Sequence, residues 1–203
     1  MTRLVVGLGN PGPEYAWTPH NVGFQVVEAL AAESKLIFGP STQLGPHRPP
    51  ASCSVARDEG RDAWLVKPLA YMNRSGEVVA PLSRALGVAA QDLFVVYDDI
   101  DLPLGALRIR PHGGHGGHNG MRSTISELGT DRFPRLRVGV GRPRTDAARH
   151  VLSAFAEGDL EVARIAAAHA AQALDAWLLD GELERLMTRF HSRWTLLGFD
   201  SPP

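Results

Sequence analysis

The residues with the clearest chemical potential are three histidines in the stretch HGGHGGHNG, residues 112–120. They stand three positions apart, separated by pairs of glycines, and an Asn-Gly pair closes the run. Such a run could ligate a metal, serve as a flexible linker, or form a loop shaped around a substrate. A zinc site needs neutral histidines in a fixed geometry, and so many glycines supply little preorganisation. The metal interpretation is therefore the weakest of the three.

A cluster of carboxylates follows the apolar run LFVV in the stretch YDDID, residues 97–101. Asp98, Asp99 and Asp101 then lie at the carboxyl end of a buried strand, where α/β folds usually bind ligands. Three interpretations stay open: a turn held by aspartate side chains, a magnesium site, or one aspartate that orients a histidine base.

Two further segments place asparagines where strands are expected to end. The stretch GLGNPG, residues 7–12, satisfies G-x-G-x-x-G, but prolines and EYAW delay the following helix. No acidic residue ends a second strand about 20 positions later, so we reject a dinucleotide site and expect a tight turn carrying Asn10. In KPLAYMNRSG, residues 67–76, Asn73 follows a strand in the same way, with helix capping as the simpler role.

A fourth histidine opens a predicted helix in the stretch TPHNVGF. His20 there feels the positive end of the helix dipole, which favours the neutral base. Taken alone, a histidine at this place is more often a surface or capping residue. The sequence has no G-x-S-x-G nucleophile motif, and Cys53 stands in a proline-rich segment without a sign of activation. A hydrolase built on these residues would therefore attack with water.

Apolar periodicity predicts the elements that position these side chains. Helices are expected at 18–36, with Thr18 as N-cap and Pro19 at the first helical position, and at 73–88, 119–129 and 159–192 with a break near Asp180-Gly181. Strands are expected at 3–9, at 63–66 as the second strand of a hairpin, and at 93–97, 106–110 and 135–141. This alternation predicts a three-layer α/β single domain over residues 1–203, with a mixed, mostly parallel twisted sheet flanked by helices.

The bulk composition limits the class of protein. A chain of 203 residues with 44% hydrophobic residues fits one domain with a substantial core. No apolar run approaches the roughly 18 residues of a membrane span, and the start is too short in apolar residues for a signal peptide. A single cysteine excludes an internal disulfide and suits a reducing cytoplasm.

Charge is spread unevenly along the chain. Residues 105–150 hold nine arginines against three acids, a local charge of +6, whereas the whole chain carries −1. An ordinary solvated surface explains this on charge alone. The alternative is a basic face for a polyanion, because arginine suits phosphate groups.

Several long segments in register together resemble bacterial peptidyl-tRNA hydrolases. They are GLGNPGPEYAWTPHNVGF, KPLAYMNRSG, YDDIDLPLGALRIRPHGGHGGHNGMRS, FPRLRVGVGRP and HVLSAF. The resemblance covers roughly residues 3–190, while 40–62 and 193–203 match poorly. It implies a monomeric, cytoplasmic α/β enzyme without cofactor or metal. Such an enzyme hydrolyses the ester between a peptide and the tRNA 3′ ribose, releasing peptide and free tRNA.

The resemblance also implies roles for individual residues. His20 would be the general base that activates water, and Asp98 would hold its imidazole in the basic form. Asn10 would sense the acylated amino group of the substrate. The tRNA 3′ end and the peptide would be contacted by Tyr15, Tyr71, Asn73 and Asn119. Met72 would wall the cleft, and the 112–120 segment would be a loop that delivers His118 and Asn119.

The sequence departs from the family pattern at position 19, where the family usually has Arg and this chain has Pro19. Any contact that this arginine makes in the family, with RNA or with residues supporting the site, is therefore not expected in this chain. Two other functions stay open: a metal-dependent hydrolase using the histidines and aspartates, and a non-catalytic RNA-binding relative on the same fold. The candidates for tRNA phosphate contacts are Arg108, Arg110, Arg142 and Arg144.

Overall fold

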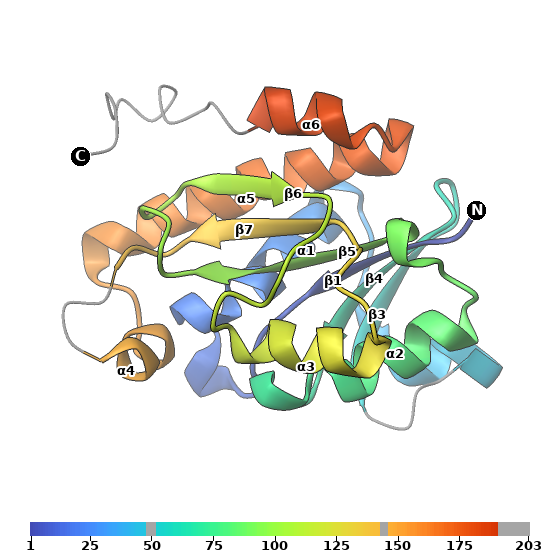
Figure 1. Cartoon of the computed structure of the whole chain (residues 1–203), viewed down its shortest axis with the longest axis horizontal. Coiled ribbons are helices and arrows are strands. Elements are labelled where there is room, and N and C mark those ends of the chain that lie inside the picture. The colour runs from blue at the N-terminus through green and yellow to red at the C-terminus, as the bar shows by residue number, and fades with distance from the viewer. Residues whose placement is uncertain (48–51, 143–145, 191–203) are drawn as a thin grey trace.

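The chain folds around a seven-stranded sheet with the strand order β2-β3-β4-β1-β5-β7-β6 (Figure 1). The computed structural model describes residues 1–47, 52–142 and 146–190. Within these residues the strands are β1 Arg3–Gly7, β2 Gly39–Pro40, β3 Cys53–Asp58, β4 Ala63–Pro68, β5 Leu93–Asp99, β6 Leu107–Arg110 and β7 Arg135–Gly139.

Parallel pairing is confined to the centre of the sheet. Strands β4, β1, β5 and β7 run parallel, and Val5 of β1 lies opposite both Leu65 and Phe94. The outer strands β2, β3 and β6 pair antiparallel, and β3 with β4 forms the predicted hairpin. The mixed sheet is therefore confirmed, and the carboxyl ends of its parallel strands meet at one edge.

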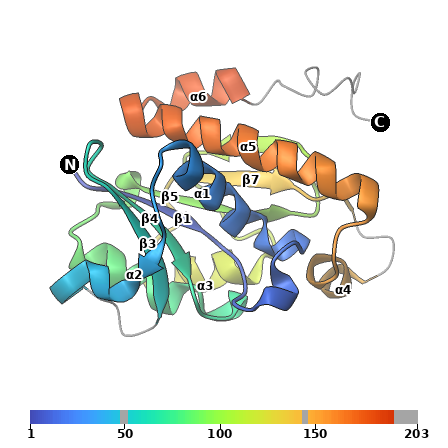
Figure 2. The same ribbon diagram turned by 180° about the vertical axis from the view of Figure 1, so that it is seen from behind.

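Helices cover both faces of the sheet, as expected for a three-layer α/β fold (Figures 1 and 2). Along β1, Val5 packs into the core beneath α1 and α5, whereas Leu4 and Val6 pack beneath α2 and α3, because successive strand side chains point to opposite faces. The helices are α1 Val22–Glu33, α2 Gly76–Ala85, α3 Asn119–Leu128, α4 Ala147–Leu152, α5 Glu157–Asp180 and α6 Leu183–Phe190. None of the helices in the described part of the chain has the length and apolar character needed to cross a bilayer.

Glycines end two helices as the sequence indicates. Gly129 follows α3 with a φ of 72°, and Gly181 follows α5 with a φ of 77°, the left-handed conformation that closes helices. The predicted break near Asp180-Gly181 is thereby confirmed. The predicted continuation to Ser192 lies outside the described residues.

The start of the first predicted helix is wrong in detail. A 3-10 turn, Pro19–Asn21 (η2), precedes α1, and the Thr18 hydroxyl donates to the Tyr15 carbonyl at 3.0 Å instead of capping the helix. Short helix starts are often 3-10, because few hydrogen bonds distinguish the two forms there. The other 3-10 turns are η1 Pro13–Tyr15, η3 Ser41–His47, η4 Met72–Arg74 and η5 Ala90–Asp92. The short helix α4 has no counterpart among the sequence predictions.

Candidate active site

A cleft of about 880 Å³ opens at the carboxyl ends of the central parallel strands. Nearly all of the predicted site residues line it, although they lie far apart in the chain. They are Asn10, Tyr15, His20, Tyr71, Met72, Asn73, Asp98, His118 and Asn119. Strand β5 runs two residues further than predicted, so Asp98 is the penultimate residue of a buried strand. The strand-end argument thus identified one common site.

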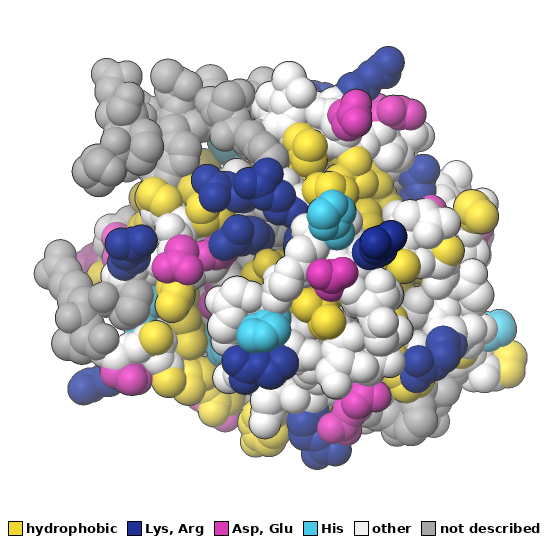
Figure 3. Space-filling model, in the orientation of Figure 1, with side chains coloured by type: hydrophobic (Ala, Val, Ile, Leu, Met, Phe, Trp, Pro, Cys, Tyr) yellow, Lys and Arg dark blue, Asp and Glu magenta, His cyan; other side chains and the backbone are white. Residues whose placement is uncertain are grey.

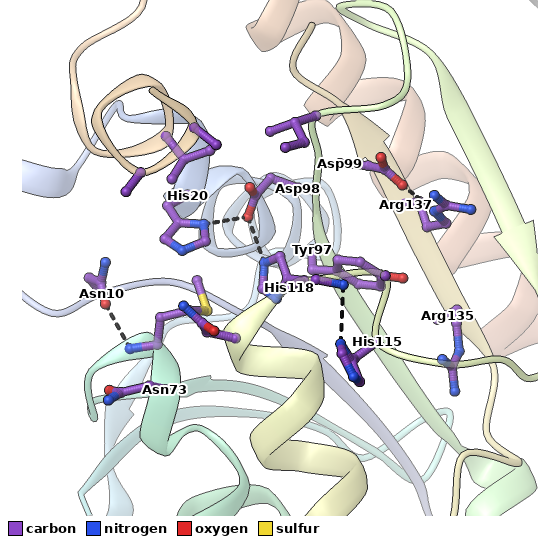
Figure 4. Close-up of a pocket in the computed structure, with 18 of the residues that line it drawn as sticks. Asn10, His20, Asn73, Tyr97, Asp98, Asp99, His115, His118, Arg135 and Arg137 are labelled. Atoms are coloured by element: carbon purple, nitrogen blue, oxygen red, sulfur yellow. Dashed lines mark hydrogen bonds and ion pairs between the residues drawn. The ribbon is translucent and has the colours of Figure 1, made fainter. Parts of the chain in front are cut away.

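One carboxylate oxygen joins two histidines at the floor of the cleft (Figure 4). Oδ1 of Asp98 lies 2.8 Å from Nδ1 of His20 and 2.9 Å from Nε2 of His118. All three side chains are largely buried, with 12% of His20, 7% of His118 and 2% of Asp98 exposed. Because an ionised carboxylate only accepts, both imidazoles must donate to it.

These contacts assign the tautomer of each histidine. Nδ1 of His20 carries a proton toward Asp98, so its Nε2 keeps a lone pair free for the cleft. Nδ1 of His118 accepts the backbone N–H of Met121 at 3.2 Å, which makes His118 the N-cap of α3. These two contacts place the ring proton of His118 on Nε2, toward Asp98. Its imidazole acts as a donor to Asp98 and not as a second base.

The environment keeps Asp98 ionised. Burial alone raises the pKa of this carboxyl, but attraction to His118 and His20 and the hydrogen bonds that they donate outweigh it. The pKa of Asp98 therefore lies well below its usual range. A permanent carboxylate is the group needed to orient His20 and to stabilise its protonated form.

Asn10 is held from two sides. Its backbone N–H donates to Oδ1 of Asn21 at 2.8 Å, and Nδ2 of Asn21 donates to the Asn10 carbonyl at 2.9 Å. Its own Oδ1 accepts the backbone N–H of Met72 at 2.8 Å. The carboxamide oxygen of Asn10 is thus occupied, and its NH₂ group remains for the cleft (Figure 4).

The turn that carries Asn10 is closely packed. A Cβ on Gly7 would lie 2.1 Å from the carbonyl oxygen of Gly23, and a Cβ on Gly9 would lie 2.7 Å from the Phe24 ring. These glycines let α1 approach β1. The G-x-G-x-x-G match is therefore a packing feature, consistent with the rejected dinucleotide interpretation.

The 112–120 segment forms a loop that leads into α3. Three of its glycines have positive φ values: 144° at Gly113, 54° at Gly116 and 81° at Gly117. Residues other than glycine rarely adopt such backbone conformations. Within the loop, Nδ1 of His115 accepts the Gly117 N–H at 3.1 Å, and the carbonyls of Gly113 and Gly114 accept hydrogen bonds from Nη1 of Arg135. His118 and Asn119, at the end of this loop, both line the cleft.

The remaining predicted residues surround this centre. Tyr71 is 61% exposed, while Met72 is buried beneath it and close to Gly120. Asn73 is exposed in η4, and it does not cap α2, whose N-cap is Ser75. Oδ1 of Asn119 accepts from Arg122 at 3.0 Å, so the Asn119 amide also presents its NH₂ group.

A magnesium site formed by the three aspartates is wrong. Asp98 turns to the histidines, whereas Asp99 forms an ion pair with Arg137 and accepts the Asp101 N–H at 2.9 Å. Neighbouring residues of a strand point to opposite faces, so the two carboxylates cannot converge. Asp101 is exposed to solvent.

Among the described residues, His20, Asp98 and His118 do offer three potential ligand atoms within 4.8 Å. Their separations of 2.8 and 2.9 Å are hydrogen-bond distances, whereas tetrahedral zinc ligands lie about 3.3 Å apart. A metal on Nε2 of His118 would also displace its proton to Nδ1, which already accepts the Met121 N–H. The arrangement therefore fits acid–base chemistry better than metal ligation.

Sequence reasoning missed several residues of the site. Asn21 follows His20 directly, but nothing local reveals its bonds to Asn10. Arg135 and Arg137 line the cleft, yet they entered only as part of a charge count. Val151 and Leu152 of the unpredicted helix α4 add an apolar wall.

Basic side chains gather over β6 and β7 beside the cleft (Figure 3). Arg108, Arg110 and Arg142 are exposed, and Arg110 lines the cleft itself. Arg144 lies outside the described residues. A basic margin next to the buried His20–Asp98 pair suits a large anionic substrate that reacts at one end.

Known proteins resemble this chain over nearly its whole length. The family model described as peptidyl-tRNA hydrolase matches residues 4–196. A peptidyl-tRNA hydrolase of Moorella thermoacetica is 43% identical over 193 residues, covering 94% of this chain and 98% of the relative. One of Desulforamulus reducens is 41% identical over 191 residues, covering 94% and 89%. A crystal structure of peptidyl-tRNA hydrolase from Acinetobacter baumannii superposes with a TM-score of 0.83 and 33% identity, covering 94% and 95% of the two chains.

Proposed function

Since this chain belongs to the peptidyl-tRNA hydrolase family and hydrolyses the ester of peptidyl-tRNA, we propose that His20 is the general base of that reaction. The observation that carries the proposal is the 2.8 Å contact of its Nδ1 with Asp98. This contact leaves Nε2 as the unprotonated nitrogen at the cleft.

Nε2 of His20 removes a proton from water as the water oxygen attacks the ester carbonyl carbon. The tetrahedral intermediate then expels the ribose 3′ oxygen, which takes the proton back from the imidazolium. Peptide leaves as a carboxylic acid, which loses its proton to solvent and becomes the carboxylate, and tRNA leaves with a free 3′ hydroxyl. An ester has a good leaving group, so general-base catalysis of about 10²–10⁴-fold with one or two amide donors suffices.

The NH₂ groups of Asn10 and Asn119 donate to different groups of the substrate. An NH₂ donor at Asn10 matches the acyl carbonyl on the substrate nitrogen, and it repels the ammonium of free aminoacyl-tRNA. The fixed orientation of the Asn10 amide, with Oδ1 on Met72 N–H, supports this discrimination. Asn119 then donates to the developing oxyanion, a contact worth about 10²–10³-fold in rate.

The margin of the cleft binds the rest of the substrate. Tyr15, Tyr71 and Asn73 contact the tRNA 3′ end, and Met72 supports them from the core. The exposed arginines beside β6 and β7 hold tRNA phosphates. Arg110 lines the cleft, and Arg108 and Arg142 are exposed, which supports this role.

The decisive experiment compares two substrates of the purified protein. N-acetyl-aminoacyl-tRNA should be hydrolysed, whereas unblocked aminoacyl-tRNA should persist. Asn10→Ala should narrow that difference, because the donor that reads the acyl carbonyl is lost. Equal rates on both substrates in the parent would contradict the role of Asn10, and loss of activity with a strong chelator would favour a metal-dependent mechanism.

We further propose that the protein works as a single-domain monomer in the cytoplasm. The family resemblance is the basis for the monomer, and one chain brings His20, Asp98 and Asn10 together in one cleft. The single cysteine, Cys53, is buried. Sedimentation at micromolar concentration tests the monomer directly, because a dimer would double the mass.

A further inference from the structure

Arg135 combines a charge with almost complete burial. It is the first residue of β7, and 1% of it is exposed. Among the described residues it forms no ion pair. Four backbone carbonyls accept from it: Phe133 from Nε at 3.2 Å, Asp131 from Nη2 at 2.6 Å, and Gly113 and, at 3.4 Å, Gly114 from Nη1. The Tyr97 side chain also forms a hydrogen bond with it.

Burying a guanidinium costs free energy of desolvation, which must be offset by hydrogen bonds to the charged group. Burial lowers the pKa of Arg135, and the neighbouring Tyr97 and Asp131 oppose that effect only in part. A buried charge is tolerated when its donors are satisfied, and here several carbonyls and the Phe133 ring at 4.3 Å serve. Lysine could not replace this arrangement, because an ammonium lacks the planar fork.

The carbonyls belong to two segments that Arg135 ties together. One is the turn at residues 131–133 before β7, and the other is the glycine loop at 113–114. A backbone bond from Gly113 N–H to the Asp131 carbonyl at 3.2 Å joins the same two segments. A Cβ added at any of the four loop glycines would meet nothing within 4 Å, so no neighbouring atoms pack against these positions.

The anchored glycines lie a few residues before the catalytic part of the loop. Only residues 115–117 separate Gly114 from His118. Two of these three, Gly116 and Gly117, lack a side chain and so restrict the backbone little. Tyr97 also contacts the catalytic end of the loop, because its ring packs against the His118 ring with centroids 4.9 Å apart. Arg135 thus fixes one end of a loop whose other end is fixed by the contact of His118 with Asp98.

We propose that Arg135 is a positioning residue for hydrolysis: its guanidinium clamps the carbonyls of Gly113 and Gly114 and so holds His118 and Asn119 at the cleft. The proposal rests on the roles given above to His118 and Asn119. It differs from a phosphate-binding role, because the donors of Arg135 already point into the protein.

The test uses Arg135→Lys and Arg135→Gln, with Arg84→Lys as the matched control. Arg84 also donates to a backbone carbonyl, that of Glu127 at 3.2 Å, but on the exposed surface of α2. Three quantities are measured: kcat and KM on N-acetyl-aminoacyl-tRNA, hydrogen exchange of segment 112–118, and the salt dependence of tRNA affinity.

For Arg135→Lys we expect kcat to fall about 10- to 100-fold with KM nearly unchanged, because misplacement of about 1 Å suffices for such a loss. Exchange in 112–118 should rise while exchange in β5 stays slow. The salt dependence should match the parent. For Arg135→Gln, which keeps a planar donor, kcat and loop exchange should lie between those of the parent and those of Arg135→Lys.

Unchanged exchange in the loop would overturn the proposal, as would raised exchange with normal kcat. A raised KM with a weaker salt dependence would instead make Arg135 a phosphate ligand, and loss of folding in both variants would make it a core residue. Hydrogen exchange reports on the clamp without any catalysis. An active His20→Ala would therefore refute the proposed function without deciding the role of Arg135.

Discussion

Two glycine-rich segments border the cleft, and their glycines are required for opposite reasons. In residues 7–23, here called the packed wall, a Cβ on Gly7 would meet the Gly23 carbonyl at 2.1 Å. In residues 112–120, the open wall, Cβ atoms on Gly113, Gly114, Gly116 and Gly117 would meet nothing within 4 Å. There the backbone conformation, with positive φ at three of the four, requires glycine.

The difference teaches how the site divides its tasks. The packed wall carries Asn10 and His20, whose partners are fixed by buried contacts such as those of Asn21. The open wall carries His118 and Asn119, and it is held mainly at its ends. The two walls meet at Oδ1 of Asp98, which accepts a bond from each.

The largest effect is expected at the base on the packed wall. His20→Ala should reduce kcat by about 10²–10⁴-fold, because no other side chain in the cleft presents an unprotonated nitrogen oriented by Asp98. The thermal unfolding temperature and the tRNA affinity of His20→Ala should stay close to those of the parent. His112→Ala, an exposed histidine of the open wall, is the control and should keep parental turnover. Near-normal turnover of His20→Ala would remove His20 from the mechanism.

The junction of the two walls should show the next effect. Asp98→Asn should keep the fold and slow hydrolysis at least about 10-fold, because an amide bonds the imidazole without stabilising its protonated form. Superimposable pH–rate profiles of variant and parent would show that Asp98 does not orient His20.

The same variant should also change the acid stability. The folded pKa of Asp98 lies below its unfolded value of about 3.9, so this carboxylate stabilises the fold above about pH 4. That contribution is lost as pH falls further. The unfolding free energy of the parent should therefore drop more steeply with acid than that of Asp98→Asn, as measured by denaturant titrations between about pH 5 and 2.

A pair of glycine substitutions tests the comparison itself. Gly7→Ala should lower the unfolding free energy by about 1–3 kcal/mol, because a backbone carbonyl occupies the space of the new methyl group. Gly114→Ala, with open space and no positive φ, should stay within about 0.5 kcal/mol of the parent. Urea denaturation measures both. If the two variants were equally stable, the packed and open walls would not differ in the way described.

The smallest effect concerns the basic margin beside the open wall. Each arginine that contacts a phosphate should contribute about one unit to the slope of log K against log[salt]. Arg110→Ala should reduce the slope of tRNA binding by about one unit, and the double variant Arg142→Ala/Arg144→Ala should reduce it by about two units. Peptide preference should not change. Equal slopes and affinities in parent and variants would leave these arginines as solvated surface and require the tRNA to dock elsewhere.

Much of this site followed from the positions of strand ends in the sequence. Asn10, Asn73 and Asp98 each come after an apolar run, and parallel strands bring such ends to one edge. The partner of each group could not be read in that way. Asp98 and Asp99 look alike in sequence, yet the alternation of a strand sends one to His20 and the other to Arg137.

Two other failures have a similar origin. A count of arginines does not separate a buried guanidinium such as Arg135 from exposed ones such as Arg108, because burial depends on the loop folded over it. The sequence around Thr18 suits a helix cap, but the 3-10 turn at Pro19–Asn21 sets the actual geometry. Such choices between similar local forms depend on tertiary contacts.

The place of β1 in the sheet has a consequence for synthesis on the ribosome. Although Arg3–Gly7 emerges first, its two neighbours are β4 and β5, which end at Pro68 and Asp99. One hydrogen-bonding edge of this apolar strand therefore stays unpaired until about a third of the chain is made, and the other until almost half is made. Long-range parallel pairing of this kind folds slowly and leaves a nascent chain prone to association. An enzyme that hydrolyses peptidyl-tRNA thus needs about a hundred residues of its own chain to be synthesised before its first strand is paired on both sides.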